Sequence, residues 1–213
     1  MTPPPAPRGR FVVLDGVDGC GKSTQARLLV ERLAPDDGPG PVHLREPGST
    51  VLGERVRALL LDRDVDLSAE VETLLFAAAR RQMLDELVAP ALAAGRDVVC
   101  ERFHPSTFAY QAVAGGLDPE ATLALLHGWA GVPEPDLVVL LETDVDEAAA
   151  RRGEATDRIE DKGLGFQRRV AEGYRLYAEL EPRVRVVDGS RPVAEVAAEV
   201  AGLLEGLVPG AGR

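Results

Sequence analysis

Residues 16–23 form a complete phosphate-binding loop, Gly-Val-Asp-Gly-Cys-Gly-Lys-Ser, which fits the G-x-x-x-x-G-K-[ST] pattern. An apolar run, residues 11–14, precedes the loop and an amphipathic stretch, residues 23–33, follows it, so a strand enters the loop and a helix leaves it. The glycines allow backbone N–H groups to converge on phosphate oxygens at the positive end of that helix. Only two of the 24 basic residues are Lys, and one of these two, Lys22, occupies the lysine position of the loop. The sequence therefore predicts a nucleotide-binding protein.

Short apolar runs alternate with helical patterns along the chain, which is typical of a parallel sheet covered on both faces. The predicted strands are residues 11–14, 42–44, 98–100, 137–141 and 184–187. The predicted helices are residues 23–33, 52–61, 69–94, 119–130, 146–152, 165–180 and 193–207. Because the strands are apolar runs without alternation, we expect them to be buried on both faces. The predicted fold class is α/β, a P-loop NTPase fold with a five-stranded parallel sheet and helices on both faces.

The length of 213 residues suits one domain with a substantial core, and no internal repeat divides it. We expect a single domain over residues 10–208, a proline-rich disordered lead of residues 1–9, and a short tail of residues 209–213. There is no apolar run of the roughly 18 residues that span a membrane, no signal peptide and no disulfide framework, so we expect a cytoplasmic protein without a membrane partner. The formal net charge of −11 argues against a nucleic-acid partner, because duplex binding requires a dense basic surface.

Polar residues follow every predicted strand. The segments after the strands begin at Asp15, Arg45, Glu101, Glu142 and Asp188. In open parallel sheets, ligands bind beyond the carboxyl ends of the strands. We therefore expect the functional residues to gather at this edge of the sheet.

The residues after the strands also separate the classes of phosphate-loop protein. A guanine-specific switch protein requires an Asn-Lys-x-Asp element, and the chain contains no Asn. A mechanical ATPase requires an acid at a strand end to activate water; Glu101 has that position, but Arg102 follows it directly. An arginine there suits a second phosphorylated substrate better than water, because its planar guanidinium matches phosphate oxygens.

Five segments, in order and with matching spacing, resemble thymidylate kinases, which phosphorylate dTMP to dTDP with ATP and have a nucleoside monophosphate kinase-like fold. They are residues 15–24, Arg-Glu-Pro-Gly-Ser-Thr at 45–50, Leu-Phe-Ala-Ala-Ala-Arg at 75–80, Glu-Arg-Phe and Ser-Thr-Phe-Ala-Tyr-Gln within 101–111, and the arginine-rich segment 151–160. Together they span about residues 10–190. The last segment is similar to the lid of the bacterial members of the family.

The resemblance implies that the phosphate loop binds ATP. The ATP-binding residues would be Gly16, Gly19, Cys20, Gly21, Lys22, Ser23 and Thr24. Lys22 is expected to reach the β- and γ-phosphates and Ser23 to ligate Mg²⁺. Glu101, where the family usually has Asp, would hold a water on that ion or be a strand-end carboxylate without a metal role. Residues 188–192 would line the adenine through their backbone, or form a helix N-cap with Ser190 capping.

The resemblance also implies a dTMP site. The substrate-binding residues would be Asp18, Arg45, Pro47, Phe76, Arg80, Arg102, Thr107, Tyr110 and Gln111. Arg102 would hold the phosphate. Arg45 would either share that phosphate or form an ion pair with a carboxylate such as Glu46. Asp18 would lie near the 3′-hydroxyl of the sugar and near the metal.

Phe76 and Arg80 are four residues apart and share a helix face, so a ring can stack on a pyrimidine while the guanidinium donates to its carbonyl. A plain core position is the alternative for Phe76. By resemblance, Thr107 and Gln111 hydrogen-bond the base. Tyr110 would pack under the deoxyribose and disfavour a 2′-hydroxyl, and Pro47 would close the pocket near the thymine methyl.

The loop has Gly19 where some family members have an arginine, so the resemblance assigns the transition-state arginine to the lid, about residues 151–163. Arg152 and Arg158 are the expected residues, and Arg151 is a third candidate. The expected catalytic residues are Asp18, Lys22, Arg102, Arg152 and Arg158.

The leading hypothesis is an ATP-dependent dTMP kinase of nucleotide biosynthesis, and the resemblance further implies a homodimer. One alternative is a kinase of the same fold that acts on another nucleotide or a nucleoside, since Glu-Arg after the third strand also resembles deoxynucleoside kinases. Another is a non-catalytic regulator that binds ATP. Two arginine clusters and a full set of acceptor-site residues argue against the regulator.

Overall fold

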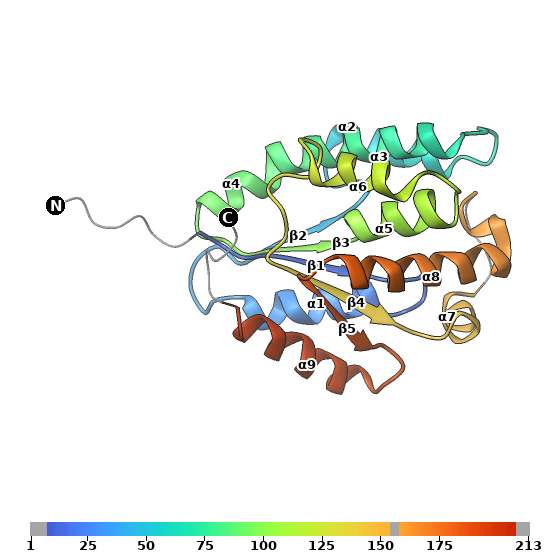
Figure 1. Cartoon of the computed structure of the whole chain (residues 1–213). Coiled ribbons are helices and arrows are strands. Elements are labelled where there is room, and N and C mark those ends of the chain that lie inside the picture. Colours follow the sequence, from blue (N-terminus) through green and yellow to red (C-terminus); the bar gives the residue numbers. More distant parts are fainter. Residues whose placement is uncertain (1–7, 154–157, 208–213) are drawn as a thin grey trace.

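Five parallel strands form the centre of the protein in a computed structural model that describes residues 8–153 and 158–207 (Figure 1). They are β1 (Phe11–Asp15), β2 (Val42–Arg45), β3 (Val98–Glu101), β4 (Leu137–Glu142) and β5 (Val184–Asp188). Their order across the sheet is β2-β3-β1-β4-β5, and every neighbouring pair is parallel. This arrangement confirms the predicted α/β fold with a five-stranded parallel sheet.

Every strand extends one residue past its predicted apolar run, to Asp15, Arg45, Glu101, Glu142 or Asp188. The hydrogen bonds between strands include these polar residues, because parallel strands pair through backbone N–H and C=O groups and not through side chains. The register aligns Asp15 with Leu140 and Arg45 with Glu101. The polar side chains at this edge are therefore held on the sheet itself and not on loops.

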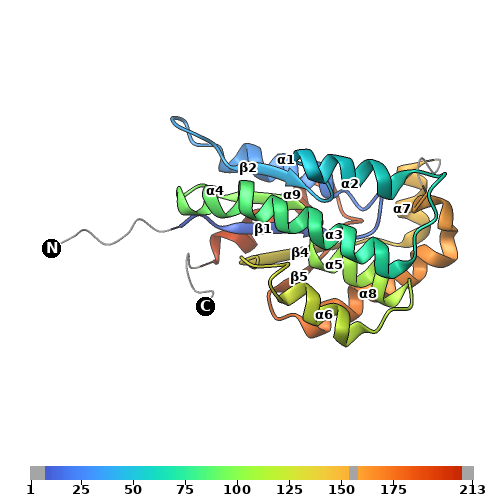
Figure 2. The same cartoon turned by 90° about the horizontal axis from the view of Figure 1, so that it is seen from above.

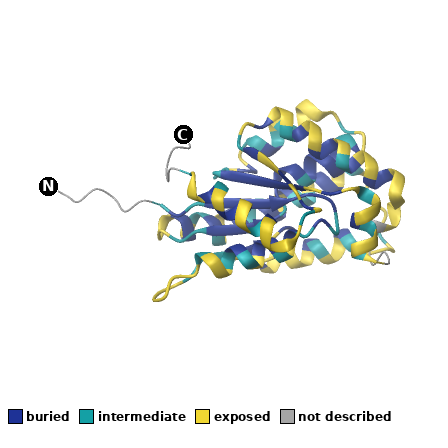
Figure 3. Cartoon of the chain, turned by 90° about the horizontal axis from the view of Figure 1, so that it is seen from below, coloured by how far each residue is buried: buried dark blue, intermediate teal, exposed yellow. Residues whose placement is uncertain are grey.

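The core lies around the central strands (Figure 3). All residues of β1 and β3 are buried, as predicted. The expectation was wrong for the two edge strands: His43 and Arg45 of β2, and Arg185 and Val186 of β5, are exposed. An edge strand lacks a neighbour on one side, so its side chains are covered less completely.

Helices cover both faces of the sheet (Figures 1 and 2). One face carries α1 (Lys22–Leu33) and α9 (Val193–Glu205), which pack against each other. The other face carries α3 (Ala69–Met83) and α8 (Gly163–Leu180), with α2 (Val51–Leu61) packed on α3. The remaining predicted helices are α6 (Pro119–His127) and α7 (Val145–Arg152).

The predicted helix over residues 69–94 is divided. It continues from α3 through a π-helical turn, η1 (Leu84–Val88), into α4 (Ala89–Ala93). Pro90 lies in the first turn of α4. A proline has no N–H donor and its ring clashes with the preceding turn, which accounts for the wider turn at this point.

A helical segment that the sequence did not predict follows β3. It consists of α5 (His104–Thr107) and a π-helical stretch, η2 (Phe108–Val113). Residues Phe108 to Ala112 are all buried, so the segment lacks the one-sided apolar pattern that reveals a surface helix. Helix α8 packs on it closely: a Cβ added to Gly173 would lie 2.7 Å from the Cα of Ala109.

The disordered N-terminal segment predicted over residues 1–9 extends too far, because Arg8 and Gly9 are bonded to the domain. Arg8 donates a hydrogen bond to Asp136 (Nη1 to Oδ2, 2.9 Å), and the N–H of Gly9 donates to the carbonyl of Leu92 (2.9 Å). Residues 1–7, residues 208–213 and, within the predicted lid, residues 154–157 lie outside the described residues. A short 3₁₀ turn, η3 (Glu160–Lys162), leads into α8. Among the described residues, no helix has the length and apolar character that crossing a membrane requires.

Candidate functional site

A cavity of about 920 Å³ lies at the carboxyl edge of the sheet. Most of the predicted site residues line it: Asp18, Gly19, Cys20, Gly21, Lys22, Ser23, Thr24, Arg45, Pro47, Phe76, Glu101, Arg102, Thr107, Tyr110 and Gln111. The cavity lining does not include Gly16, Arg80, Arg152 or Arg158. All five segments that resemble the family therefore converge on one space, the last of them through Arg151, the third lid candidate.

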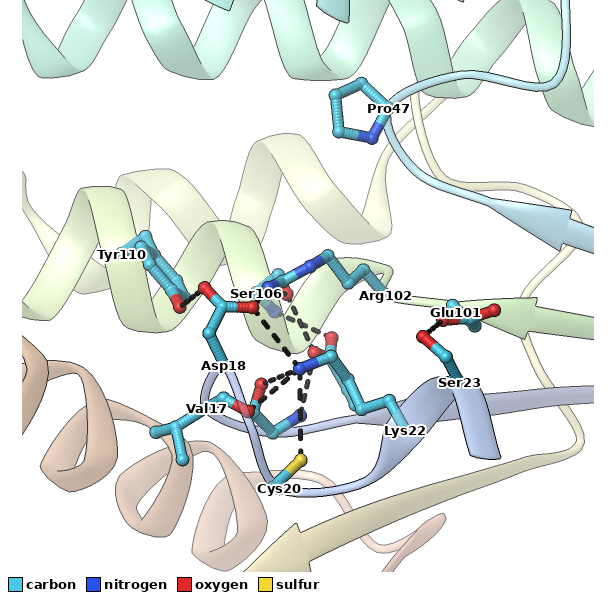
Figure 4. Close-up of polar contacts among 12 residues, drawn as sticks. Val17, Asp18, Cys20, Lys22, Ser23, Pro47, Glu101, Arg102, Ser106 and Tyr110 are labelled. Atoms are coloured by element: carbon cyan, nitrogen blue, oxygen red, sulfur yellow. Dashed lines mark hydrogen bonds and ion pairs between the residues drawn. The ribbon is translucent and has the colours of Figure 1, made fainter. Parts of the chain in front are cut away.

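The phosphate loop has the backbone that its glycines permit. Gly16, Gly19 and Gly21 have φ values of 140°, 91° and 99°, which other residues rarely adopt. At Gly19 a Cβ would also lie 2.0 Å from the carbonyl oxygen of Ala148. Lys22 begins α1, and its Nζ donates to the carbonyls of Gly16 and Val17, both at 2.9 Å (Figure 4). The ammonium group is thus held over the loop.

An acid in the loop pairs with the arginine after β3. Asp18 accepts hydrogen bonds from Nη2 of Arg102 and from the hydroxyl of Tyr110, the latter at 3.1 Å (Figure 4). Burial alone would raise the pKa of Asp18, but the charges of Arg102 and Lys22 outweigh it and hold the pKa well below its usual range. Burial, together with the Asp18 charge, raises the pKa of Tyr110, so its hydroxyl remains a donor. Arg102 itself has a left-handed backbone, with φ of 68°.

Asp15, at the end of β1, accepts hydrogen bonds from the turn that carries Arg102. It is fully buried and accepts from the N–H groups of Phe103 (3.1 Å) and Ser106 (3.0 Å) and from the hydroxyl of Tyr174 (2.8 Å). Ser106 in turn accepts from Nη1 of Arg102 at 3.0 Å. The sequence placed Asp15 at the functional edge but did not reveal that it organises the turn carrying Arg102.

Two oxygen ligands suited to Mg²⁺ lie side by side at the start of α1 and the end of β3. Ser23 Oγ donates a hydrogen bond to Oε2 of Glu101, and Nε2 of His43 lies 2.9 Å from Oε1 of the same carboxylate. Among the described residues, no group of three or more His, Cys, Asp or Glu side chains could form an all-protein metal site. Mg²⁺ prefers few protein ligands and keeps waters and phosphate oxygens, so this pair fits such an ion.

The predicted base-binding arginine is buried behind the cavity wall. Arg80 is paired with Glu46, with Nη2 to Oε2 at 2.8 Å, and also donates to Oγ1 of Thr107 at 2.9 Å. Its Nη1 is buried without a partner among the described residues. Because Glu46 pairs with Arg80, the alternative of an ion pair between Glu46 and Arg45 is wrong, and Arg45 lines the cavity instead.

The lid arginines occupy different surroundings. Arg151 lines the cavity and donates to the carbonyl of Gly189 at 3.0 Å. Arg158 lies outside the lining: it donates to the carbonyl of Leu60 at 3.0 Å and pairs with Glu72 at 2.8 Å. Arg152, on the same helix as Arg151, is also outside the lining. Arg151, the third candidate, thus lines the cavity, whereas Arg152 and Arg158 do not.

Sequence reasoning missed part of the wall. The additional lining residues are Gln25, Arg57, Leu61, Ser106, Ile159, Val193 and Val196. Of the segment 188–192, residues Gly189 to Pro192 line the cavity. The N-cap role considered for Ser190 is wrong, because the N-cap of α9 is Pro192 and the Ser190 hydroxyl bonds to Asp188 at 2.6 Å.

Comparisons with known proteins agree with this geometry. A family model described as thymidylate kinase matches residues 14–200. The thymidylate kinase of Dinoroseobacter shibae is 45% identical over 197 residues, which cover 90% of this chain and 94% of that protein. The thymidylate kinase of Symbiobacterium thermophilum is 42% identical over 202 residues, covering 93% and 94% respectively. A solved structure, the thymidylate kinase from Ehrlichia chaffeensis, has a TM-score of 0.77 at 31% identity and covers 93% of this chain and 100% of that one. This chain therefore belongs to the thymidylate kinase family.

Proposed function

We infer that this protein transfers the γ-phosphoryl group of ATP to the phosphate of dTMP, giving ADP and dTDP. One observation carries the inference beyond family membership: two cationic groups, Lys22 in the phosphate loop and Arg102 after β3, line the same cavity. Phosphoryl transfer requires a donor and an acceptor phosphate in line, with their charge neutralised, and little covalent chemistry by the protein.

The donor site is the phosphate loop. Backbone N–H groups at the start of α1 bind the phosphates, and Lys22 leaves the loop carbonyls to contact the β- and γ-oxygens. Mg²⁺ held by Ser23, with Glu101 contacting it directly or through water, would neutralise charge on the β- and γ-phosphates. The backbone of residues 189–192 forms the adenine end.

The acceptor site begins at Arg102. Its guanidinium binds the dTMP phosphate, with Arg45 as a second cation. Asp18 keeps Arg102 in place and lies beside the 3′-hydroxyl of the sugar. Tyr110, held by its hydrogen bond to Asp18, packs under the deoxyribose and disfavours a 2′-hydroxyl.

The base binds deeper in the cavity. Phe76 stacks on the thymine ring and Pro47 closes the pocket at its methyl group. Thr107 and Gln111 hydrogen-bond the base. The buried Nη1 of Arg80, which has no partner among the described residues, supplies a donor for the 4-carbonyl, because a buried donor without an acceptor is costly.

The lid supplies the transition-state arginine. Arg152 and Arg158 are proposed from the family pattern, and Arg158 would have to leave Glu72 to act. Arg151 is already at the cavity. Alanine variants of the three residues separate them: loss of the acting arginine lowers kcat by about 10³-fold or more, and loss of the others does not.

Steady-state assays with dTMP, dUMP, dCMP, AMP and thymidine test the substrate. We expect the highest kcat/KM with dTMP, and the assignment fails if thymidine or AMP is the best acceptor. Arg102→Ala should abolish turnover and leave ATP affinity unchanged. If it weakened only ATP binding, the acceptor role of Arg102 would be wrong.

Both alternatives raised by the sequence are less favoured. A kinase for another nucleotide or a nucleoside, and a regulator that binds ATP without catalysis, would not require the match to thymidylate kinases over residues 14–200. The same assays separate these classes, because a regulator would give no turnover with any acceptor.

We also propose a homodimer in the cytoplasm. Exposed apolar side chains on α3, Val71 at 42% and Leu74 at 62%, are available to a second copy of the chain. Both cysteines, Cys20 and Cys100, are buried and unpaired, which suits a reducing compartment. Analytical ultracentrifugation tests the dimer, and Leu74→Asp should shift the equilibrium to the monomer.

A further inference from the structure

Glu72 is a buried carboxylate in the first turn of α3 that joins the base pocket to the lid. Its side chain is 1% exposed. Oε2 accepts a hydrogen bond from Nε2 of Gln111 at 2.9 Å. Oε1 lies 2.8 Å from Nη2 of Arg158 and 3.2 Å from Nζ of Lys162. Lys162 is the second of the two lysines in the chain. A carboxylate this deeply buried requires such partners, because an unpaired buried charge is strongly destabilising.

The contact with Glu72 determines which end of the Gln111 amide faces the cavity. A primary amide has a donor end, the NH₂ group, and an acceptor end, the carbonyl oxygen. A carboxylate that pairs with two cations offers acceptors only. The NH₂ end of Gln111 must therefore point to Glu72, and Oε1 remains for the cavity that Gln111 lines.

We propose that Glu72 is a positioning residue for base selection: by fixing the Gln111 amide, it presents an acceptor to N3 of the bound pyrimidine. This step rests on the proposed function, in which Gln111 meets the base of dTMP. Thymine carries a hydrogen on N3 and is a donor there, so the two groups are complementary. Cytosine has a lone pair at N3, so the same Oε1 would face a second acceptor with no hydrogen between them.

Fixing the amide matters because glutamine can otherwise serve either base. A half-turn about its last side-chain torsion exchanges Oε1 and Nε2, and the exchanged amide would donate to N3 of cytosine. Glu72 opposes the half-turn, since it would bring Oε1 of Gln111 against a carboxylate oxygen. Selection against cytosine then comes from leaving buried acceptors unpaired, which is how polar sites reject near-isosteric ligands.

The two cations restrain Glu72 itself. Arg158 and Lys162 both contact Oε1, which leaves Oε2 to Gln111. Arg158 is anchored independently, because it also donates to the carbonyl of Leu60 from Nε (3.2 Å) and Nη2 (3.0 Å). The orientation of the Gln111 amide is thus supported by two cations of the lid segment, and Lys162 would remain at Oε1 if Arg158 left Glu72 to act on the phosphates.

The variant Glu72→Gln tests the proposal, because it keeps the shape of the side chain and adds a donor that can accommodate the exchanged amide. We expect the ratio of kcat/KM for dTMP over dCMP to fall about tenfold or more, mainly through KM. The ratio for dTMP over dUMP should stay within about twofold, because uracil presents the same groups as thymine at N3 and O4. A variant that only disturbed the packing of the site would not lower the dTMP/dCMP ratio while leaving the dTMP/dUMP ratio unchanged.

Two further variants keep the test decisive. Glu72→Asp retains an acceptor-only carboxylate, and we expect its dTMP/dCMP ratio to stay nearer to wild type than that of Glu72→Gln. Glu70→Gln, on the exposed side of the same helix turn, is the matched control and should change neither ratio. In a Gln111→Leu background, Glu72→Gln should have no further effect on selectivity, because the group it positions is gone.

Failure of the inference and failure of the proposed function give different results. An unchanged dTMP/dCMP ratio in Glu72→Gln, or a ratio that Glu72→Asp loses equally, overturns the role of Glu72 while dTMP remains the substrate. A wild-type enzyme that does not phosphorylate dTMP overturns the proposed function. If Glu72→Gln does not fold, the comparison of Glu72→Asp with Glu70→Gln decides: a tenfold or greater loss of the ratio in Glu72→Asp, roughly the full effect expected for Glu72→Gln, contradicts the proposal.

Discussion

Nη2 of Arg80 lies 2.8 Å from Oε2 of Glu46, and the two side chains are only 1% and 4% exposed. The guanidinium also lies over the ring of Phe103, 4.8 Å from its centroid. The pair joins the segment after β2 to α3 and fixes the position of the Arg80 guanidinium behind the cavity wall. Removing either charge leaves the other buried without a counter-ion.

We therefore expect Glu46→Gln to lower the free energy of unfolding by about 3–5 kcal/mol. For a chain of this length, that corresponds to a fall in Tm of about 10 °C, measured by thermal denaturation. The double variant Glu46→Leu/Arg80→Met should recover most of the loss, because no charge is left unpaired. A loss below about 1 kcal/mol in Glu46→Gln would show that the carboxylate is dispensable.

The stability of the protein should fall as the pH drops below the usual pKa of histidine. His104 is 2% exposed and stacks on Phe103, with ring centroids 4.1 Å apart. Burial, and then the charges of Arg80 and His127, lower the pKa of His104 well below its usual value. Below about pH 6.5, His104 therefore binds a proton in the unfolded chain but not in the folded protein. The free energy of unfolding falls as the pH decreases below this value.

The loss is at most about 1.4 kcal/mol per pH unit, and it vanishes above about pH 7.5. Urea unfolding at two pH values, one near neutrality and one about two units lower, measures it. His104→Phe keeps a ring against Phe103 and removes the titrating group. We expect it to reduce the pH dependence. Equal pH dependence in the two proteins would assign the acid sensitivity to other groups.

Gly173 should not tolerate a methyl group. A Cβ there would lie 2.7 Å from the Cα of Ala109 and 3.0 Å from the Cβ of Val113, so α8 and η2 would have to separate. We expect Gly173→Ala to cost about 1–3 kcal/mol in the free energy of unfolding. Gly202, inside α9, is the matched control, since nothing lies within 4 Å of its added Cβ. Gly202→Ala should stabilise by about 0.5–1 kcal/mol, and equal effects at both sites would contradict the close packing.

Turnover should depend on Mg²⁺ through Glu101. Chelation with EDTA is expected to reduce the rate to background, and added MgCl₂ to restore it. Glu101→Gln should raise the Mg²⁺ concentration for half-maximal rate by about tenfold or more. Glu142→Gln is the control, because Glu142 ends β4 as Glu101 ends β3 but does not line the cavity. An unchanged Mg²⁺ dependence in Glu101→Gln would leave Glu101 as a strand-end carboxylate that positions Ser23.

The sequence predicted the sheet and most of the cavity wall for identifiable physical reasons. Buried parallel strands are continuous apolar runs, and the residues after them necessarily meet at one edge of the sheet. The phosphate loop can be recognised in the sequence because its glycines occupy positions with positive φ, which other residues rarely adopt. The position of Arg102 at this edge could be predicted for the same reason, because Arg102 directly follows β3.

The contacts that the sequence did not reveal join distant segments without a local pattern. Glu72 and Gln111 are 39 residues apart, and either one alone resembles an ordinary helical residue. Which lid arginine lines the cavity could not be predicted for a different reason. Arg151 and Arg152 are adjacent on α7, and one residue turns a helix by roughly 100°, so only the docking of α7 decides which of them meets the cavity.

The π-helical stretch η2 has a consequence for how this site tolerates length changes. A π turn amounts to one extra residue in an otherwise α-helical path, and here it includes Tyr110 and Gln111. Deleting a single residue within it would remove the wide turn and let the rest of the path continue as an ordinary α-helix in its present position. The side chains of Tyr110 and Gln111 would then lose the wide turn that sets their direction relative to Thr107, although no atom of the phosphate loop had moved. A deletion in this short span should therefore disturb the cavity wall while the helix beyond it keeps its place.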